Sequence, residues 1–309
     1  MHLAPCFPER YARGVSAARI PTKFIAEVSS NHARDLARCL EFVDVTARIG
    51  CGAVKFQLFK LDELFAPEAR RAKPELERRR EWELPVEFLE PIAKRAHEQG
   101  IEFCCTPFYL QAVDELFPHV DFYKVASYEL LWHPLIAACA KTGKPLVLST
   151  GMATLDEIGA AVQVAREAGC SQLTLLHCTS SYPTPAAEAN LAAMGTMARA
   201  FDCPVGWSDH TVSPAVVTRA IHKWGATEVE FHLDLDGKGA EYAAGHCWLP
   251  DQMKALIDDL AVSFVADGTG EKVPVPAELP DRIWRADPGD GLRPIEETRA
   301  KLRASWGDT

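Results

Sequence analysis

Short apolar runs recur along this chain, and a stretch with helical periodicity separates each run from the next. Strands that read as nearly continuous apolar runs, joined by amphipathic helices, are typical of a parallel sheet covered by helices. Eight such runs occupy residues 24–28, 53–59, 102–108, 122–127, 145–150, 173–179, 204–210 and 228–235. Eight strand–helix units within about 240 residues predict an α/β fold, a closed (β/α)8 TIM barrel rather than an open doubly wound sheet.

The stretches between the runs carry the expected helix signals. Thr154 and Glu157 have the spacing of a capping box, and Gly50 and Gly169 follow periodic stretches as C-terminal cap glycines do. No G-x-G-x-x-G motif follows the first apolar run. This lowers the case for a dinucleotide-binding fold.

The barrel is expected to span residues 1–265. Within it, the charged segment 60–90 is too long for a simple loop and is interpreted as a solvated helix with proline ends. Five prolines lie between Pro274 and Pro294. We therefore expect residues 266–309 to form a Pro/Gly-rich tail with one short helix near 295–306 and no second domain.

The composition limits the partners. The chain of 309 residues has a formal net charge of −10, which argues against nucleic acid or an anionic membrane as a partner. It has no run of eighteen apolar residues and no leader-like start, so we expect a soluble, cytoplasmic protein. Its ten cysteines lack C-x-x-C spacing, which fits reduced thiols and disfavours a cysteine zinc site.

In a TIM barrel the active site lies at the C-terminal ends of the strands. Two lysines, Lys55 and Lys124, interrupt apolar runs there, and a buried lysine is costly unless a negative group meets it. With the hydroxyls of Thr106, Ser127 and Ser149 they would suit a phosphate with an adjoining carboxylate. The alternative is a pair of structural salt bridges between lysine and glutamate.

Two histidines, His210 and His232, end the seventh and eighth apolar runs. These strands are neighbours in the barrel, so both imidazoles could point into its mouth and hold a divalent ion such as Mn²⁺ with open positions. The acidic residues Asp209, Asp234 and Glu27 favour this interpretation. The alternative is that both rings are packed and hydrogen-bonded.

Several motifs, in this order, resemble the sialic acid synthase family: "FIAEVSSNH", "AVKFQ", "CTPF", "FYKVASYE", "KTGKPLVLSTGMATLDEI", "LLHCTSSYPTP", "VGWSDHT" and "EFHLDLD". The resemblance runs from about residue 22 to 262 and leans toward the pseudaminic or legionaminic branch. It implies a barrel transferase that forms a C–C bond between phosphoenolpyruvate and an N-acyl amino-sugar aldehyde. The product would be a nonulosonic acid, a 2-keto-3-deoxy acid like sialic acid, and phosphate.

The resemblance also implies roles for single residues. It assigns Mn²⁺ or Mg²⁺ to His210 and His232. It implies that phosphoenolpyruvate is bound by Lys55, Thr106, Lys124, Ser127 and Ser149. It places the catalytic carboxylates Glu27 and Glu129, with the acceptor-binding residues Gln57 and Tyr182, around the sugar and the reacting carbons.

Two departures from the family pattern leave the acceptor open. About forty residues follow the barrel, too few for the family's C-terminal antifreeze-like domain, so a homodimer would form through barrel helices. The segment 239–248, "GAEYAAGHCW", replaces the family's "PGPDH". Two alternatives remain: another phosphoenolpyruvate-dependent aldol-type synthase for a different aldehyde, or a non-catalytic barrel that binds sugar or phosphate.

Overall fold

A computed structural model of the chain describes residues 21–305. The first twenty residues of the predicted barrel, and Trp306 at the end of the predicted tail helix, lie outside this part. The chain divides into two compact units, one up to Ser263 and one from Phe264 onward. We describe each unit by itself.

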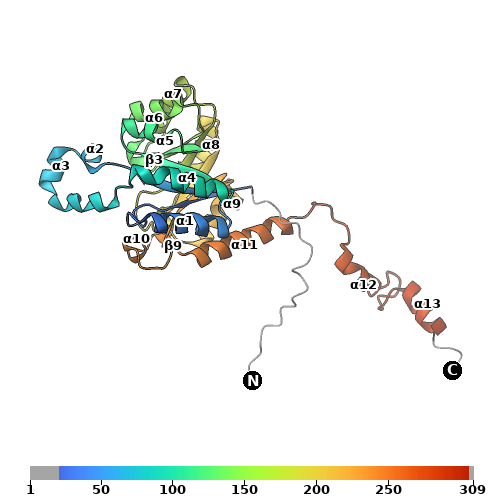
Figure 1. Ribbon diagram of the computed structural model, residues 1–309. Helices are drawn as coiled ribbons and strands as arrows, with labels where there is room; N and C mark the ends of the chain where they lie inside the picture. Colours follow the sequence, from blue (N-terminus) through green and yellow to red (C-terminus); the bar gives the residue numbers. More distant parts are fainter. Residues whose placement is uncertain (1–20, 306–309) are drawn as a thin grey trace. The chain divides into compact units, whose positions relative to one another are not determined.

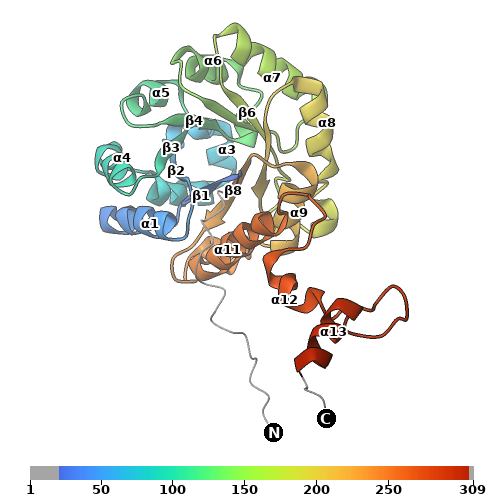
Figure 2. The ribbon, with the colours of Figure 1, turned by 90° about the vertical axis from the view of Figure 1, so that its right-hand side faces the viewer.

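The first unit is a closed barrel of parallel strands (Figures 1 and 2). Each strand pairs with the next in the sequence, and β8 pairs with β1 to close the ring. The strands are β1 (Lys23–Glu27), β2 (Ala53–Leu58), β3 (Glu102–Pro107), β4 (Phe122–Val125), β5 (Leu146–Ser149), β6 (Leu173–His177), β7 (Val205–Asp209) and β8 (Glu228–Leu233). The predicted (β/α)8 TIM barrel is confirmed.

Helices form a ring outside the strands, as Figure 2 shows. They are α1 (Leu36–Arg48), α4 (Leu89–Glu98), α5 (Leu110–Leu116), α6 (His133–Lys141), α7 (Leu155–Glu167), α8 (Ala192–Phe201), α9 (Pro214–Trp224) and α11 (Pro250–Ala266). The predicted capping box begins α7, because Thr154 Oγ1 accepts from Glu157 N and the Glu157 carboxylate accepts from Thr154 N. None of the described helices combines the length and apolar character needed to cross a membrane.

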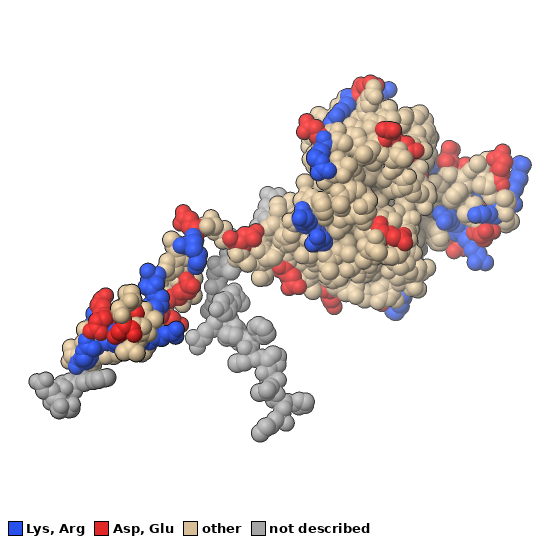
Figure 3. All heavy atoms as spheres, turned by 180° about the vertical axis from the view of Figure 1, so that it is seen from behind, with Lys and Arg blue, Asp and Glu red and all other residues tan. Residues whose placement is uncertain are grey.

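The charged segment after β2 is not the single solvated helix that we expected. It forms α2 (Leu61–Leu64), α3 (Pro67–Ala72) and the 3₁₀ helices η2 (Pro74–Trp82) and η3 (Val86–Phe88). Pro67 and Pro74 each start a new element because proline cannot donate the hydrogen bond that a continuing helix needs. Basic and acidic side chains mix on this segment, at the right of Figure 3, and Arg80 pairs with Asp62 at 2.8 Å.

The barrel interior is layered, and the layers explain where the polar residues lie. Side chains two positions apart on a strand share one face. A buried apolar cluster inside the barrel consists of Ile25, Ala53, Cys104, Phe122, Val147 and Leu176, from six strands. Two residues further along the chain from each of these come Glu27, Lys55, Thr106, Lys124, Ser149 and, directly after β6, Cys178. A buried polar layer therefore lies above an apolar floor, toward the C-terminal ends of the strands.

The second unit holds η6 (Pro276–Glu278), α12 (Leu279–Arg282) and α13 (Glu296–Ser305). Most of its described side chains are exposed. Arg299 of α13 pairs with Asp290 at 2.7 Å and with Glu296 at 3.2 Å, and such exposed pairs stabilise little. α13 lies where the sequence predicts a short helix. That this segment contributes no second domain stays a prediction.

Candidate active site

Lys55 is the centre of a buried ion cluster. Its Nζ lies 2.8 Å from Glu27 Oε2 and 2.9 Å from Glu230 Oε1, and all three side chains are almost fully buried. Burial alone would lower the pKa of Lys55, but Glu230 and Glu27 raise it above its usual value. Lys55 is therefore charged and already paired, as the salt-bridge alternative proposes.

Lys124 is less well paired. Its Nζ lies 3.8 Å from Glu230 Oε2 and donates a hydrogen bond to the carbonyl oxygen of Val125 at 3.2 Å. Burial lowers the pKa of Lys124, against the pull of Glu230, and the nearby charge of Lys55 lowers it further. An ammonium group has three donors, so Lys124 keeps capacity for an incoming anion.

The predicted hydroxyls divide into two groups. Thr106 Oγ1 and Ser149 Oγ are buried and have no hydrogen-bond partner among the described residues. Ser127 is already engaged, since its Oγ accepts from Gly151 N at 3.0 Å and lies 3.2 Å from Cys178 Sγ. A buried polar atom without a partner costs about 1–3 kcal/mol, so the first two hydroxyls fit a ligand oxygen.

The two predicted catalytic carboxylates differ in their surroundings. Glu27 accepts from Gln57 Nε2 at 2.7 Å and pairs with Lys55. Glu129 lies in the 3₁₀ helix η4 (Ser127–Glu129), and its Oε2 is buried with no partner in the described part of the chain. Burial raises the pKa of Glu129 to about 7, although Lys124 acts in the opposite direction. Glu129 is thus placed to exchange a proton near neutral pH.

Replacing Glu129 with glutamine should change how stability depends on pH. The folded-state pKa of about 7 lies above the ordinary value of 4.5, so this group favours folding at low pH and that stability is lost as pH rises from 4.5 through 7. We expect Glu129→Gln to be more stable than wild type by ~2 kcal/mol at pH 8, with a much smaller difference at pH 4.5. Urea unfolding at both pH values measures this. The exposed control Glu75→Gln should show no such gain, and an equal gain in both variants would contradict the burial argument.

The two predicted metal histidines lie side by side in the mouth of the barrel. Their ring centroids are 5.5 Å apart. His210 Nδ1 bonds to the carbonyl oxygen of Thr179 at 2.8 Å, and His232 Nδ1 bonds to Glu241 Oε2 at 2.9 Å. A carbonyl or carboxylate on one ring nitrogen is the usual support of a metal-binding histidine, and it leaves Nε2 of each ring for an ion. The donor set therefore fits a divalent metal.

The two rings have different proton affinities. Burial and the neighbouring His232 lower the pKa of His210 to about 3, so this ring is neutral, which is the form that binds metals. Burial alone would lower the pKa of His232, but Glu241 raises it above its usual value. A metal at His232 therefore competes with a proton that Glu241 favours.

The predicted acceptor residues also lie at this mouth. Tyr182 follows β6 and is 41% exposed, and its ring centroid lies 4.2 Å from that of His210 and 5.9 Å from that of His232. Gln57 on β2 reaches Glu27 and Ser29. A molecule that touches Tyr182 from the open side would therefore be close to both histidines.

Two acidic residues do not support the metal pair as expected. The Asp209 carboxylate accepts from the indole nitrogens of Trp207 at 3.0 Å and Trp248 at 2.9 Å. The Asp234 carboxylate accepts from the backbone of Gly237 at 2.8 Å. Asp209 lies one position from Ser208, which faces the interior residue Glu230, so its own side chain leaves the barrel interior. Asp234 follows the last residue of β8, and its carboxylate is engaged by the backbone of the loop that comes next.

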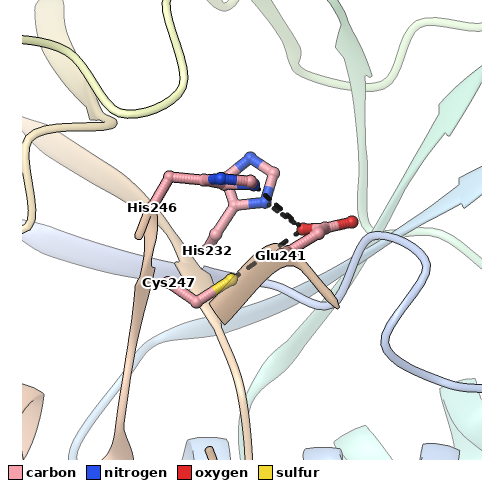
Figure 4. Close-up of side chains that lie close together, drawn as sticks. All are labelled: His232, Glu241, His246 and Cys247. Atoms are coloured by element: carbon pink, nitrogen blue, oxygen red, sulfur yellow. Dashed lines mark hydrogen bonds and ion pairs between the residues drawn. The ribbon is translucent and has the colours of Figure 1, made fainter. Parts of the chain in front are cut away.

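The sequence interpretation missed three residues of the site. Glu230, on β8, forms ion pairs with both lysines, at 2.9 Å with Lys55 and at 3.8 Å with Lys124, and it lies two positions before His232, a spacing that could have placed it on the same face. Glu241 and His246 come from the loop after β8, and Figure 4 shows both beside His232. The sequence shows that this loop departs from the family pattern, but the sequence alone does not show that these two side chains lie beside His232.

Known proteins with similar sequence or structure point the same way. The NeuB family model matches residues 42–272. N,N'-diacetyllegionaminic acid synthase of Legionella pneumophila is 35% identical over 84% of this chain and 76% of its own length. Pseudaminic acid synthase of Campylobacter jejuni is 31% identical over 80% of this chain and 75% of its own.

A solved structure agrees with the sequence matches. The crystal structure of N-acetylneuraminic acid (sialic acid) synthetase from Leptospira borgpetersenii, in complex with citrate, superposes with a TM-score of 0.74 at 27% identity. The match covers 92% of this chain and 93% of that one. The resemblance noted from the sequence motifs is confirmed, and the chain belongs to the NeuB family.

Proposed function

We propose that this protein condenses phosphoenolpyruvate with an N-acyl amino-sugar aldehyde to give a nonulosonic acid and phosphate. One observation carries the proposal: a single barrel mouth holds two kinds of group. These are the buried cations and hydroxyls of Lys55, Lys124, Thr106 and Ser149, and the imidazoles of His210 and His232. The named relatives of the chain, which are legionaminic, pseudaminic and sialic acid synthases, support the same reaction.

The polar layer would bind phosphoenolpyruvate. Lys124 supplies the least neutralised cation, and the hydroxyls of Thr106 and Ser149 supply donors that lack partners among the described residues. Lys55 contributes its charge from within its pairs with Glu27 and Glu230. Ser127 would offer its hydroxyl hydrogen once it turns from Cys178.

His210 and His232 would hold Mn²⁺ or Mg²⁺ through Nε2. Such an ion supplies Lewis-acid polarisation of the acceptor aldehyde. Tyr182 and Gln57 would bind the acceptor sugar, because they border the histidines and the carboxylates. Thr179 and Glu241 fix the orientation of the two rings throughout.

The chemistry follows from these positions. C3 of phosphoenolpyruvate attacks the aldehyde carbon, which forms the new C–C bond and leaves positive charge at C2. The π bond of the aldehyde breaks, and its oxygen becomes an alkoxide that takes up a proton to give a hydroxyl group. Water adds at C2, and Glu129, whose carboxyl group titrates near neutral pH, takes the proton from that water. The bond between C2 and the oxygen of the phosphate group then breaks. Lys124 and Lys55 stabilise the phosphate that leaves.

We further propose that the protein acts in the cytoplasm and that it forms a homodimer through barrel helices. Neither nucleic acid nor a membrane has a role in this proposal.

Oxygen labelling tests the proposed reaction. The protein is incubated in H₂¹⁸O with phosphoenolpyruvate, Mn²⁺ and a panel of N-acyl hexosamines and other aldehydes, and the products are analysed by mass spectrometry. We expect ¹⁸O in the C2 hydroxyl of a nonulosonic acid and none in the phosphate. Label in the phosphate would mean P–O cleavage and would contradict the proposal. Turnover of only a different aldehyde would favour another aldol-type synthase, and no phosphate release with any aldehyde would favour a binding protein.

A further inference from the structure

The loop after β8 brings four potential metal donors together. It runs from Asp234 through the short helix α10 (Ala240–Ala243) to the strand β9 (Cys247–Trp248). Donor atoms of His232, Glu241, His246 and Cys247 all lie within 4.8 Å of one another. Figure 4 shows the four side chains close together, with Glu241 in contact with the others. Three of these four residues come from the segment that departs from the family pattern.

The distances suit one ion. Glu241 Oε2 lies 2.9 Å from His232 Nδ1, 3.5 Å from His246 Nε2 and 3.9 Å from Cys247 Sγ. Nitrogen, oxygen and sulfur ligands at about 2.0–2.3 Å from one ion lie about 3–4 Å from each other. The four donors could therefore take up an ion without a large rearrangement.

The surrounding structure holds these donors in place. β9 pairs with β8 so that His232 lies opposite Cys247. The other carboxylate oxygen of Glu241, Oε1, accepts from the hydroxyls of Ser29 at 2.6 Å and Ser30 at 2.7 Å. Such outer contacts orient a ligand and increase metal affinity.

The state of His246 is a separate observation that points to a ligand. This side chain is nearly buried, with 8% exposed, and its Nδ1 is buried with no hydrogen-bond partner among the described residues. Its other nitrogen reaches Glu241 only at 3.5 Å, which is long for a hydrogen bond. Within the described part of the chain, the His246 ring therefore has no short hydrogen bond at either nitrogen, and an ion bound at Nε2, the nitrogen on the Glu241 side, would give this buried polar group a firm partner.

We propose that His232, Glu241, His246 and Cys247 bind one divalent ion of the borderline-soft class, such as Zn²⁺ or Co²⁺. A set that mixes imidazole, carboxylate and thiolate favours these ions over Mn²⁺ or Mg²⁺. The site uses Nδ1 of His232, whereas the ion proposed with His210 uses Nε2. A neutral imidazole has one lone pair for a metal, so the two positions exclude each other. The inference does not depend on the proposed reaction.

Co²⁺ binding to the full chain tests the inference by absorption spectroscopy. The chelator-treated protein is titrated with Co²⁺, and we expect one equivalent to give intense visible bands of a tetrahedral site and a near-ultraviolet band from thiolate. Cys247→Ser should abolish the near-ultraviolet band and keep the visible bands. His246→Asn should weaken binding at least about tenfold. His210→Ala is the matched control and should bind Co²⁺ like wild type.

Three results would overturn the inference. One is failure of the wild-type chain to bind Co²⁺ with a thiolate band. Another is survival of that band in Cys247→Ser, which would place the ion on a different cysteine. The third is loss of binding in His210→Ala, which would place the ion between His210 and His232. Circular dichroism of each variant checks the fold, and only folded variants are scored. Because no substrate is present, these results are independent of whether the proposed reaction occurs.

Discussion

His210→Ala is expected to lower kcat/KM for the condensation by about 10³-fold while leaving the barrel folded. The ring is one of two imidazoles proposed to hold the ion that polarises the aldehyde. Its Nδ1 contact with the Thr179 carbonyl leaves Nε2 toward the mouth, and its low pKa keeps it neutral. Loss of this ligand removes charge stabilisation that matters most in the transition state, so kcat should fall more than the apparent affinity for phosphoenolpyruvate.

The measurement is steady-state phosphate release with Mn²⁺ or Mg²⁺ added after chelation. His119→Ala is a suitable control, since it removes a histidine that follows α5 at the opposite end of the barrel. That variant should keep wild-type rates. Near-full activity of His210→Ala in metal-free buffer would show that the Lewis-acid role is wrong. If this variant lost activity but bound Co²⁺ like wild type, the ion between His210 and His232 would be distinct from the ion held by His232, Glu241, His246 and Cys247.

The fold could be predicted because one sequence pattern, an apolar run followed by an amphipathic helix, is repeated along the chain. Each strand of the barrel is buried on both faces, so it reads as an apolar run, and each covering helix has one apolar face. The prediction of a single helix in segment 60–90 was wrong, because hydrophobic periodicity does not show where a proline divides a helix. Pro67 and Pro74 begin separate short elements there.

The site could be predicted in part, for a related reason. Lys55, Lys124, His210 and His232 stand out because polar residues that end or interrupt a barrel strand tend to face its mouth. The two-residue period of a strand then decides which neighbours join them. Strict use of this two-residue period would have added Glu230 to the predicted site and removed Asp209 from it. The Asp209 carboxylate instead accepts hydrogen bonds from Trp207 and Trp248.

The loop after β8 could not be predicted by the same rules. Glu241 and His246 are placed by backbone turns that Asp234 organises, through bonds to the backbone nitrogens of Gly237 and Gly239. Gly239 has no room for a side chain, because a Cβ there would overlap the Asp234 carboxylate. Such contacts join residues without any periodic spacing, so they become visible only in three dimensions.

Lys124→Met is expected to lower kcat/KM for phosphoenolpyruvate by about 10²–10³-fold, with a much smaller effect on the KM of the acceptor. The physical reason is the unequal pairing of the two lysines. Lys55 has carboxylate oxygens at 2.8 and 2.9 Å, whereas Lys124 has one at 3.8 Å. Burial lowers the pKa of Lys124, so a bound phosphate would supply the negative charge that stabilises its ammonium form.

Methionine keeps most of the volume of the side chain, so this variant should fold and the lost activity should reflect lost charge. Lys94→Met, on the exposed side of α4, removes a lysine far from the mouth and should leave both KM values unchanged. Lys124→Arg should recover part of the activity, since it restores the charge but not the compact ammonium group. Kinetics at varied phosphoenolpyruvate and fixed acceptor measure all three variants. If Lys124→Met kept the wild-type kcat and KM for phosphoenolpyruvate, Lys124 would have to be removed from the anion site, and the buried lysine pair would be structural.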